Sequence, residues 1–201
     1  MKALHSTLTA LVAIVLSASG CMKMNMTSQV NRAAVPEQIQ RVLVVGDFSD
    51  LALKESAETR LCDELNSKTQ SRCFRSFDYA SPGVGPNAAI QEAAPKVNAD
   101  AFLLLRQVGG DSRREDLQKI ECTRDTCSSA GPSGIRVTKL TGSYEINLYV
   151  PDGDSPVWYA TSSANGNAFH DWQDLVSATA AKAVEKLMED EVLKPHSPGG
   201  N

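Results

Sequence analysis

The stretch Arg41-Val42-Leu43-Val44-Val45-Gly46-Asp47-Phe48 decides the fold class of this chain. Its apolar residues are consecutive rather than alternating, so a strand formed here has two apolar faces. Strands of that kind are typical of the buried centre of a sheet that helices cover. The stretch Ala101-Phe102-Leu103-Leu104-Leu105 repeats the pattern. The sequence therefore predicts two central strands of one sheet.

An amphipathic helix is expected directly after the first of these strands. Apolar residues recur there every four positions, at Leu53, Ala57, Leu61 and Leu65. This spacing predicts a helix over 51–67, for which Ser49 or Asp50 is the expected cap.

A second strand and helix are expected before the second central strand. Residues 72–79 predict a short strand, and residues 88–97 predict a helix that Asn87 caps and Pro95 kinks or interrupts. The order strand, helix, strand, helix, strand predicts parallel neighbours joined by right-handed crossovers.

The character of the chain changes after Gly110. Residues 111–134 are charged and then turn-like, which predicts an exposed loop inserted into the domain. Residues 135–150 alternate between apolar and polar, which predicts a half-buried strand that a turn joins to a returning strand over 157–163. Asp171 is the expected cap of a final helix that ends near residue 192. The fold class is therefore a mixed α/β sheet in two or three layers, β-α-β-α-β followed by an antiparallel hairpin and a C-terminal helix.

The N-terminal stretch Leu16-Ser17-Ala18-Ser19-Gly20-Cys21 has the layout of a secretory signal, because an apolar run precedes small residues and Lys2 precedes the run. It resembles the lipobox of bacterial lipoproteins, with Ala18 where that family usually has leucine. The resemblance implies that residues 1–20 are removed and that Cys21 is lipidated. Met22 is not the aspartate that signals inner-membrane retention in that class, so the resemblance implies the outer membrane.

Two other interpretations of this segment are an ordinary signal peptide and an uncleaved membrane anchor. The apolar run over 8–16 is shorter than the ~20 residues that a bilayer core requires. The predicted organisation is a signal peptide over 1–20, a lipidated N-terminus with a flexible tether over 21–39, one α/β domain over 40–193 and a disordered tail over 194–201.

Four cysteines remain if Cys21 carries lipid: Cys62, Cys73, Cys122 and Cys127. An even number in an exported chain predicts disulfides, and four cysteines allow three pairings. The local pairings Cys62–Cys73 and Cys122–Cys127 need the least rearrangement of the chain. A metal site at the second pair is the competing interpretation, although no histidine lies near it in the sequence.

Charge and motifs limit the possible functions. The formal net charge is −4 for the whole chain and −5 once Lys2 is removed, which argues against a nucleic-acid partner. No P-loop, Gly-x-Ser-x-Gly or His-Glu-x-x-His pattern occurs, and we expect neither a cofactor nor a metal.

Six residues are the remaining candidates for a site. Asp47 follows a central strand, Gly83 precedes a helix, and the pair His170 and Asp171 joins a histidine to a carboxylate. A ligand pocket near the strand ends at Asp47 and Gly83 would fit a small-molecule or glycan-binding or hydrolytic protein. Simple turns and helix caps explain the same residues. Trp158 and Trp172 are possible binding platforms, but amphipathic spacing favours core packing for both.

Three segments carry a further resemblance: residues 42–48, residues 98–102 and the stretch from Val157 through the last helix. Their order resembles that of the TolB amino-terminal domain, the curli-secretion lipoprotein and the penicillin-binding-protein activator lipoproteins. The resemblance implies a non-enzymatic role in envelope assembly, with an envelope protein or a second copy of the chain as the partner.

Overall fold

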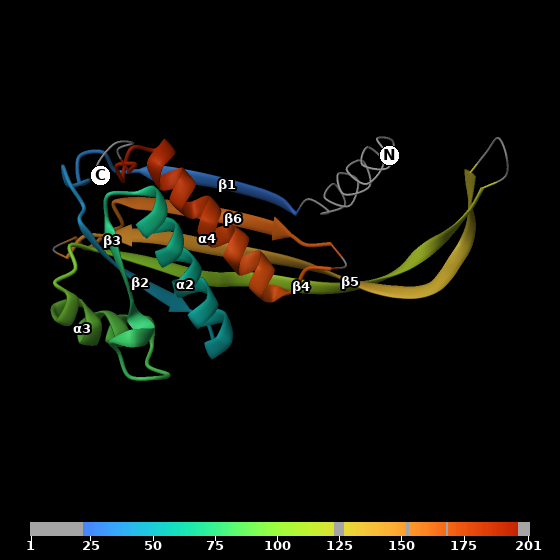
Figure 1. Cartoon of the computed structure of the whole chain (residues 1–201), viewed down its shortest axis with the longest axis horizontal. Helices are drawn as coiled ribbons and strands as arrows, with labels where there is room; N and C mark the ends of the chain where they lie inside the picture. The colour runs from blue at the N-terminus through green and yellow to red at the C-terminus, as the bar shows by residue number, and fades with distance from the viewer. Residues whose placement is uncertain (1–21, 123–126, 152, 168, 197–201) are drawn as a thin grey trace, which may run out of the picture.

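The computed structural model describes residues 22–122, 127–151, 153–167 and 169–196, with side chains for all of these except 117–122 and 127–135. Six strands form one sheet in the order β1-β6-β5-β4-β2-β3 (Figure 1). The mixed α/β fold predicted from the sequence is confirmed.

The first half of the chain forms the parallel part of the sheet. Strand β2 (Arg41–Asp47) lies between β3 (Arg72–Arg75) and β4 (Ala101–Cys122) and is parallel to both. Helix α2 (Leu51–Lys68) connects β2 to β3, and Asp50 caps it by accepting from two backbone N–H groups. The predicted 72–79 strand is shorter, because the 3₁₀ helix η1 (Ser76–Asp78) follows β3.

Helix α3 (Pro86–Val97) connects this region to β4. It begins one residue before the predicted cap, with Gly85 as the N-cap and Pro86 in the first turn, where a missing N–H costs nothing. Pro95 does not interrupt the helix, which continues to Val97 and ends at Asn98 in the left-handed conformation, with φ of 49°.

The second half of the chain forms the antiparallel part. Strand β5 (Cys127–Tyr149) pairs with β4 and with β6 (Trp158–Asn165), and β6 pairs with β1 (Lys23–Val30). Helix α4 (Trp172–Glu189) ends the fold, and Asp171 caps it in a capping box with Asp174.

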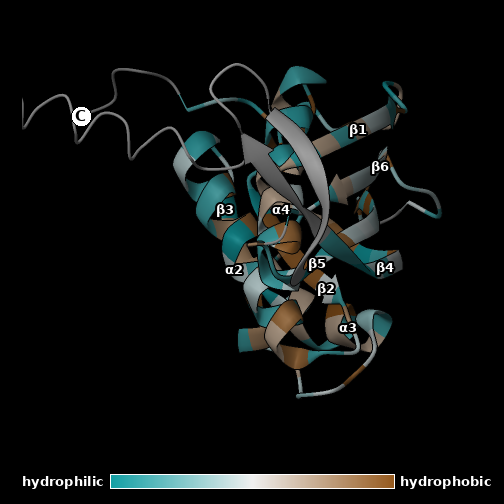
Figure 2. Ribbon diagram, turned by 90° about the vertical axis from the view of Figure 1, so that its right-hand side faces the viewer, coloured by the Kyte–Doolittle hydropathy of each residue, from teal (hydrophilic) through white to brown (hydrophobic). Residues whose placement is uncertain are grey.

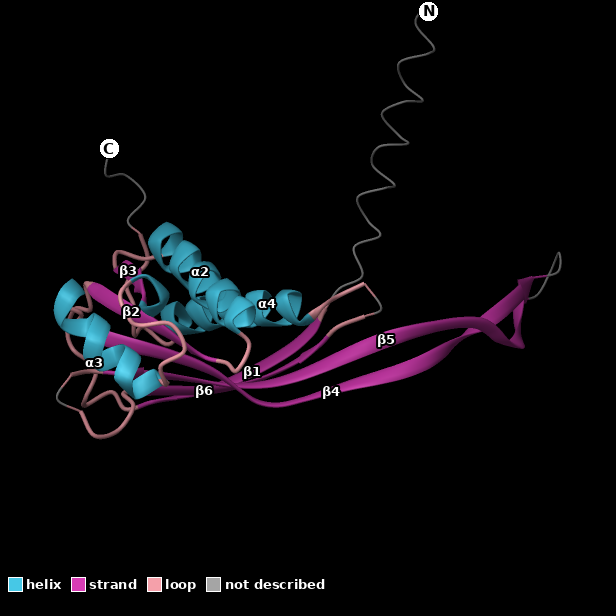
Figure 3. Cartoon of the chain, turned by 90° about the horizontal axis from the view of Figure 1, so that it is seen from below, coloured by secondary structure: helices cyan, strands magenta, loops and turns pink. Residues whose placement is uncertain are grey.

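Apolar side chains cover the two faces of the sheet unequally. Val42 and Val44 face the large core under α2 and α4, whereas Leu43 and Val45 face a smaller core under α3. Figure 2 shows the hydrophobic colour gathered where helices meet the sheet, and Figure 3 shows α2 and α4 together on one side of it. The sheet is therefore covered on both faces near β2, β3 and the start of β4, whereas no described helix covers the polar alternate face of β1, β5 and β6.

Two predictions about the chain ends are wrong. Residues 23–30 were expected to form a flexible tether, but they form β1, because alternate residues such as Met24 and Met26 pack against the large core. The tail over 194–201 was expected to be disordered, but Pro195 bridges to Thr69, and the His196 N–H donates to the Lys68 carbonyl at 2.8 Å. The prediction is therefore wrong for 194–196, and residues 197–201 lie outside the described residues.

The predicted loop over 111–134 is also wrong. Strands β4 and β5 continue through this segment as a two-stranded ribbon that extends beyond the rest of the sheet (Figure 1). Strands β1, β6, β5 and β4 lie side by side up to one last row of register partners, which consists of Lys23, Asn165, Thr141 and Asp111. We call the paired segments 112–122 and 127–140 the arm.

Candidate functional site

A cavity of about 340 Å³ lies beyond the carboxyl end of β2 and beside the middle of β4. Asp47 and Asp50 line it from the end of β2 and the start of α2, and Gln107 lines it from β4. Trp172, the first residue of α4, completes the wall. The fold thus brings together Asp47 and the start of the final helix, which lie far apart in the sequence.

A glycine shapes the wall of this cavity. A Cβ atom at Gly110 would lie 2.6 Å from Gln107 Nε2 and 2.8 Å from the Trp172 ring. The register of β4 and β5 shifts between Gln107 and Gly109, as expected for a bulge that turns side chains toward a site. The indole ring therefore lies against the backbone of β4 because no side chain fills that space.

The other predicted site residues do not line this cavity. Gly83 has φ of 79° in the loop before α3, and open space surrounds the position where its Cβ would be. His170 Nδ1 accepts from the Asn167 N–H at 3.1 Å, and Asp171 caps α4. Each of these residues thus has a local structural role. Trp158 is a fully buried core residue.

Sequence reasoning missed a buried carboxylate. Glu58 on α2 is fully buried and accepts three hydrogen bonds: from Gly46 N–H at 2.9 Å, from Ser76 Oγ at 2.7 Å and from Phe77 N–H at 2.8 Å. Burial raises the pKa of Glu58, although these hydrogen bonds and the nearby Lys54 favour the charged form. Glu58 thereby fixes the end of β2 and the segment after β3 to α2. A glutamate three residues before the buried Leu61 is the only signal in the sequence.

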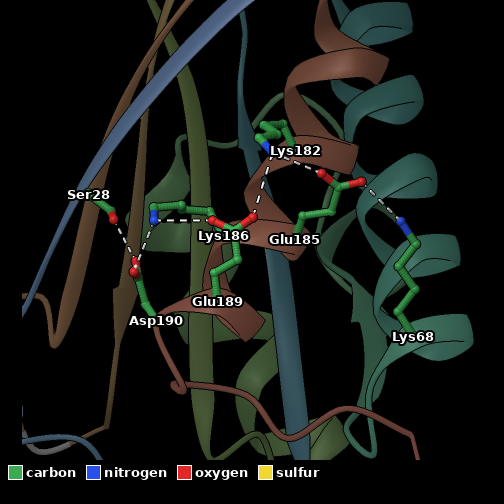
Figure 4. Close-up of polar contacts among 7 residues, drawn as sticks. All are labelled: Ser28, Lys68, Lys182, Glu185, Lys186, Glu189 and Asp190. Carbon is green, nitrogen blue, oxygen red and sulfur yellow. Dashed lines mark hydrogen bonds and ion pairs between the residues drawn. The ribbon is translucent and has the colours of Figure 1, made fainter.

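A second polar network holds β1 to the body (Figure 4). Ser28 Oγ donates to Asp190 Oδ2 at 2.5 Å, and Trp158 Nε1 donates to the same oxygen at 2.8 Å. Lys186 Nζ lies 3.2 Å from Asp190 Oδ1. Burial opposes the charge on Asp190, but the bonds from Ser28, Trp158 and Lys186 outweigh it and lower the pKa of the carboxyl.

The network continues along α4 to α2. Lys182 and Lys186 pair with Glu189, and Lys182 also pairs with Glu185. Glu185 Oε1 lies 3.5 Å from Lys68 Nζ on α2. These pairs are partly exposed and contribute little to stability. Of those named, the Lys68–Glu185 pair joins α4 to α2.

Side chains cover the β3 edge of the sheet. A disulfide joins Cys62 on α2 to Cys73 on β3, with Cα atoms 5.1 Å apart, as the local pairing predicted. The Cys73 N–H, which β2 does not use, donates to Asn66 Oδ1 at 2.9 Å. Arg72 lies over the Phe74 ring at 5.0 Å. A short strand whose outward donor already has an acceptor is a poor template for another strand.

The β1 edge has a different character. Strand β1 is eight residues long, carries one charge at Lys23 and has no proline. The Asn31 N–H donates to the Val157 carbonyl. By the alternation of antiparallel pairs, the backbone groups that point away from β6 are those of Met24, Met26, Ser28 and Val30. Within the described residues, no strand pairs with this outer side.

Some predicted sites lie outside what the structure describes. Cys21 is not among the described residues, so its lipidation stays a prediction. Cys122 and Cys127 are register partners in the arm, but their side chains are not described, and the choice between a disulfide and a metal site stays open. Among the described side chains, no group of three or more histidine, cysteine or acidic residues is arranged to hold a metal ion. No helix in the described part of the chain is both long and apolar enough to cross a membrane.

Comparisons with known proteins support the fold alone. No family model and no curated protein matches the chain. Among solved structures, it is similar to the PelC dodecamer from Paraburkholderia phytofirmans, with a TM-score of 0.50 and 14% identity over 82% of this chain and 97% of that one. A second PelC dodecamer structure from that organism gives a TM-score of 0.47 at 12% identity over the same shares. A minor lipoprotein from Acinetobacter baumannii gives 0.39 at 9% identity, over 79% of this chain and 98% of that one.

Proposed function

We propose that this protein is a lipid-anchored envelope protein of the bacterial outer membrane, faces the periplasm, and acts by binding envelope proteins and other copies of itself. The signal-like N-terminus and Cys21 support the anchor. The likeness of the fold to a protein described as a dodecamer supports self-association.

The observation that carries this proposal is the position of β1 relative to Cys21. Only Met22 separates Cys21 from Lys23, the first residue of β1, so the chain between the lipid and the sheet spans at most about 7 Å. Lys23 lies in the row of residues at which the arm begins. A lipid at Cys21 would therefore hold the base of the arm close to the membrane surface.

This orientation restricts where the arm can lie. The described side chains at its base include Arg113, Arg114, Glu115 and Asp116, and three of these are exposed. Charged side chains on both faces of a ribbon are not compatible with bilayer hydrocarbon. The base of the arm therefore lies outside the bilayer hydrocarbon, where it can reach proteins anchored nearby.

Labelling with a palmitate analogue tests the anchor. The wild-type chain should incorporate the label and fractionate with the outer membrane, and Cys21→Ser should lose both properties. Met22→Ser is the matched control, because it changes the next residue and keeps the cysteine. Label retained by Cys21→Ser, or fractionation of the wild type with the inner membrane, would contradict the proposal.

The cavity at Asp47 favours a second candidate function, the binding of a small molecule or glycan. An indole ring, two carboxylates and an amide around about 340 Å³ are groups that bind polar rings. Only two tryptophans occur in the chain, and Trp158 is buried in the core, so a fluorescence change on adding a ligand would report Trp172. A saturable change in the wild type that is lost in Asp47→Asn would support this function.

A further inference from the structure

The arm lacks the support that a β-ribbon needs. Within the described residues, β4 pairs only with β5 from Ser112 onward, and at about 3.4 Å per residue the eleven residues to Cys122 extend about 35 Å. Two exposed ion pairs, Arg136–Asp116 and Lys139–Glu115, join the strands near the base. Such pairs contribute little, and a two-stranded ribbon is at best marginally stable in water. A third strand or a packing surface is required.

Among the described strands, none pairs with the outer side of β1. Its outward N–H and C=O groups form a row about 27 Å long, estimated from its eight residues. Natural sheets usually protect such edges with charge, proline or a short strand, as this chain does at β3. In β1, the one charge lies at its first residue.

We propose that the arm of one copy pairs with the free edge of β1 in a neighbouring copy, so that the copies associate head to tail. The same chain thus provides both the ribbon that needs another strand and the edge that needs a neighbour, and the two are of similar length. Arm and edge are different surfaces, so the contact is heterologous and generates a ring or a filament. This inference rests on the proposed self-association and names the surfaces that produce it.

Two variants of the full chain, purified in detergent, test the pairing from both sides. In the first, Asn-Gly replaces residues 113–139 and joins Ser112 to Leu140, which are register partners, through a two-residue turn. In the second, Met26→Pro removes one outward N–H and leaves the bonds to β6 in place. Met26→Ala is the matched control, because it shortens the same side chain and keeps the N–H.

The masses of the assemblies, measured by light scattering, give the first readout. We expect the wild type and Met26→Ala to form oligomers, and the arm deletion and Met26→Pro to need at least a tenfold higher concentration to associate. If Met26→Pro does not fold, the arm deletion decides the result, because it leaves β1 unchanged.

Hydrogen exchange provides the second readout. The amides of Met24, Met26, Ser28 and Val30 should exchange at least tenfold faster in the arm deletion than in the wild-type oligomer. An oligomer that survives the arm deletion with these amides protected would overturn the pairing while self-association stands. A wild type that stays monomeric but is anchored through Cys21 would overturn both the pairing and self-association, and the anchor would stand.

Discussion

The two edges of the sheet differ in what protects them. At the β3 edge, a disulfide, the Asn66 amide and the buried Glu58 carboxylate join the strand and the segment after it to α2. At the β1 edge, Ser28 bonds to Asp190, and residues such as Met24 and Met26 pack against the large core, but no disulfide joins the strand to a helix within the described residues. One edge is therefore closed to further strands and the other is open, which gives any assembly through the sheet a single direction.

The largest expected effect is at the closed edge. The double change Cys62→Ser and Cys73→Ser should lower the free energy of unfolding by about 3 kcal/mol in the chain-entropy model, because the disulfide closes a loop with a sequence separation of 11. Urea unfolding of the variant and of the reduced wild type measures the loss. An unchanged midpoint would show that packing of α2 alone closes this edge.

Glu58→Gln should have the next largest effect, about 2 kcal/mol, because the new amide group would face a backbone N–H instead of accepting from it. The raised pKa also sets a pH dependence. In the wild type the unfolded carboxyl ionises first as pH rises above 4.5, so stability falls from there to the raised pKa of the folded state. Urea unfolding between pH 4 and 8 should show this loss in the wild type and in the exposed control Glu55→Gln, but not in Glu58→Gln.

The open edge should respond to pH in the opposite direction. The lowered pKa of Asp190 adds stability above the ordinary value of 3.8, and that stability is lost as pH falls through the folded-state value. Asp190→Asn should therefore remove this acid-side loss and cost about 1–2 kcal/mol at neutral pH, because the bonds from Ser28 and Trp158 lose a charged acceptor. Glu191→Gln, which changes an exposed carboxylate, is the control. Equal acid sensitivity in Asp190→Asn and the wild type would contradict this assignment.

The buried half of the fold was predictable because the spacing of its apolar residues directly indicates which of them are buried. The continuous apolar stretch around Val44 and the four-residue spacing through Leu61 specify β2 and α2 without reference to the rest of the chain. Strand β1 was not predictable in this way. Its partners lie on β6, more than a hundred residues later, and the alternation of methionine with polar residues has the composition of a linker.

The arm was missed for a related reason. Charged and turn-forming residues have low intrinsic strand propensity, and only the register with the opposite strand makes 111–122 extended. Asp47 was a candidate because of its position at a strand end, although a cap or a solvated residue explained it equally, and in the structure it lines a cavity. Trp172 lines that cavity through tertiary packing, although its spacing on α4 favoured a core residue over a binding platform.

The change with the smallest expected effect tests whether the protection of the β3 edge can be separated from the stability of the fold. Asn66→Ala removes the acceptor of the Cys73 N–H but leaves the disulfide and Glu58 in place, so it should cost only about 1 kcal/mol. The Cys73 amide should exchange measurably faster, since the edge of β3 then has a free donor. Asp63→Ala, at an exposed position on the same helix, should change neither quantity. If the Cys73 amide stays as protected in Asn66→Ala as in the wild type, then the cover provided by α2, and not the single hydrogen bond, is what closes this edge.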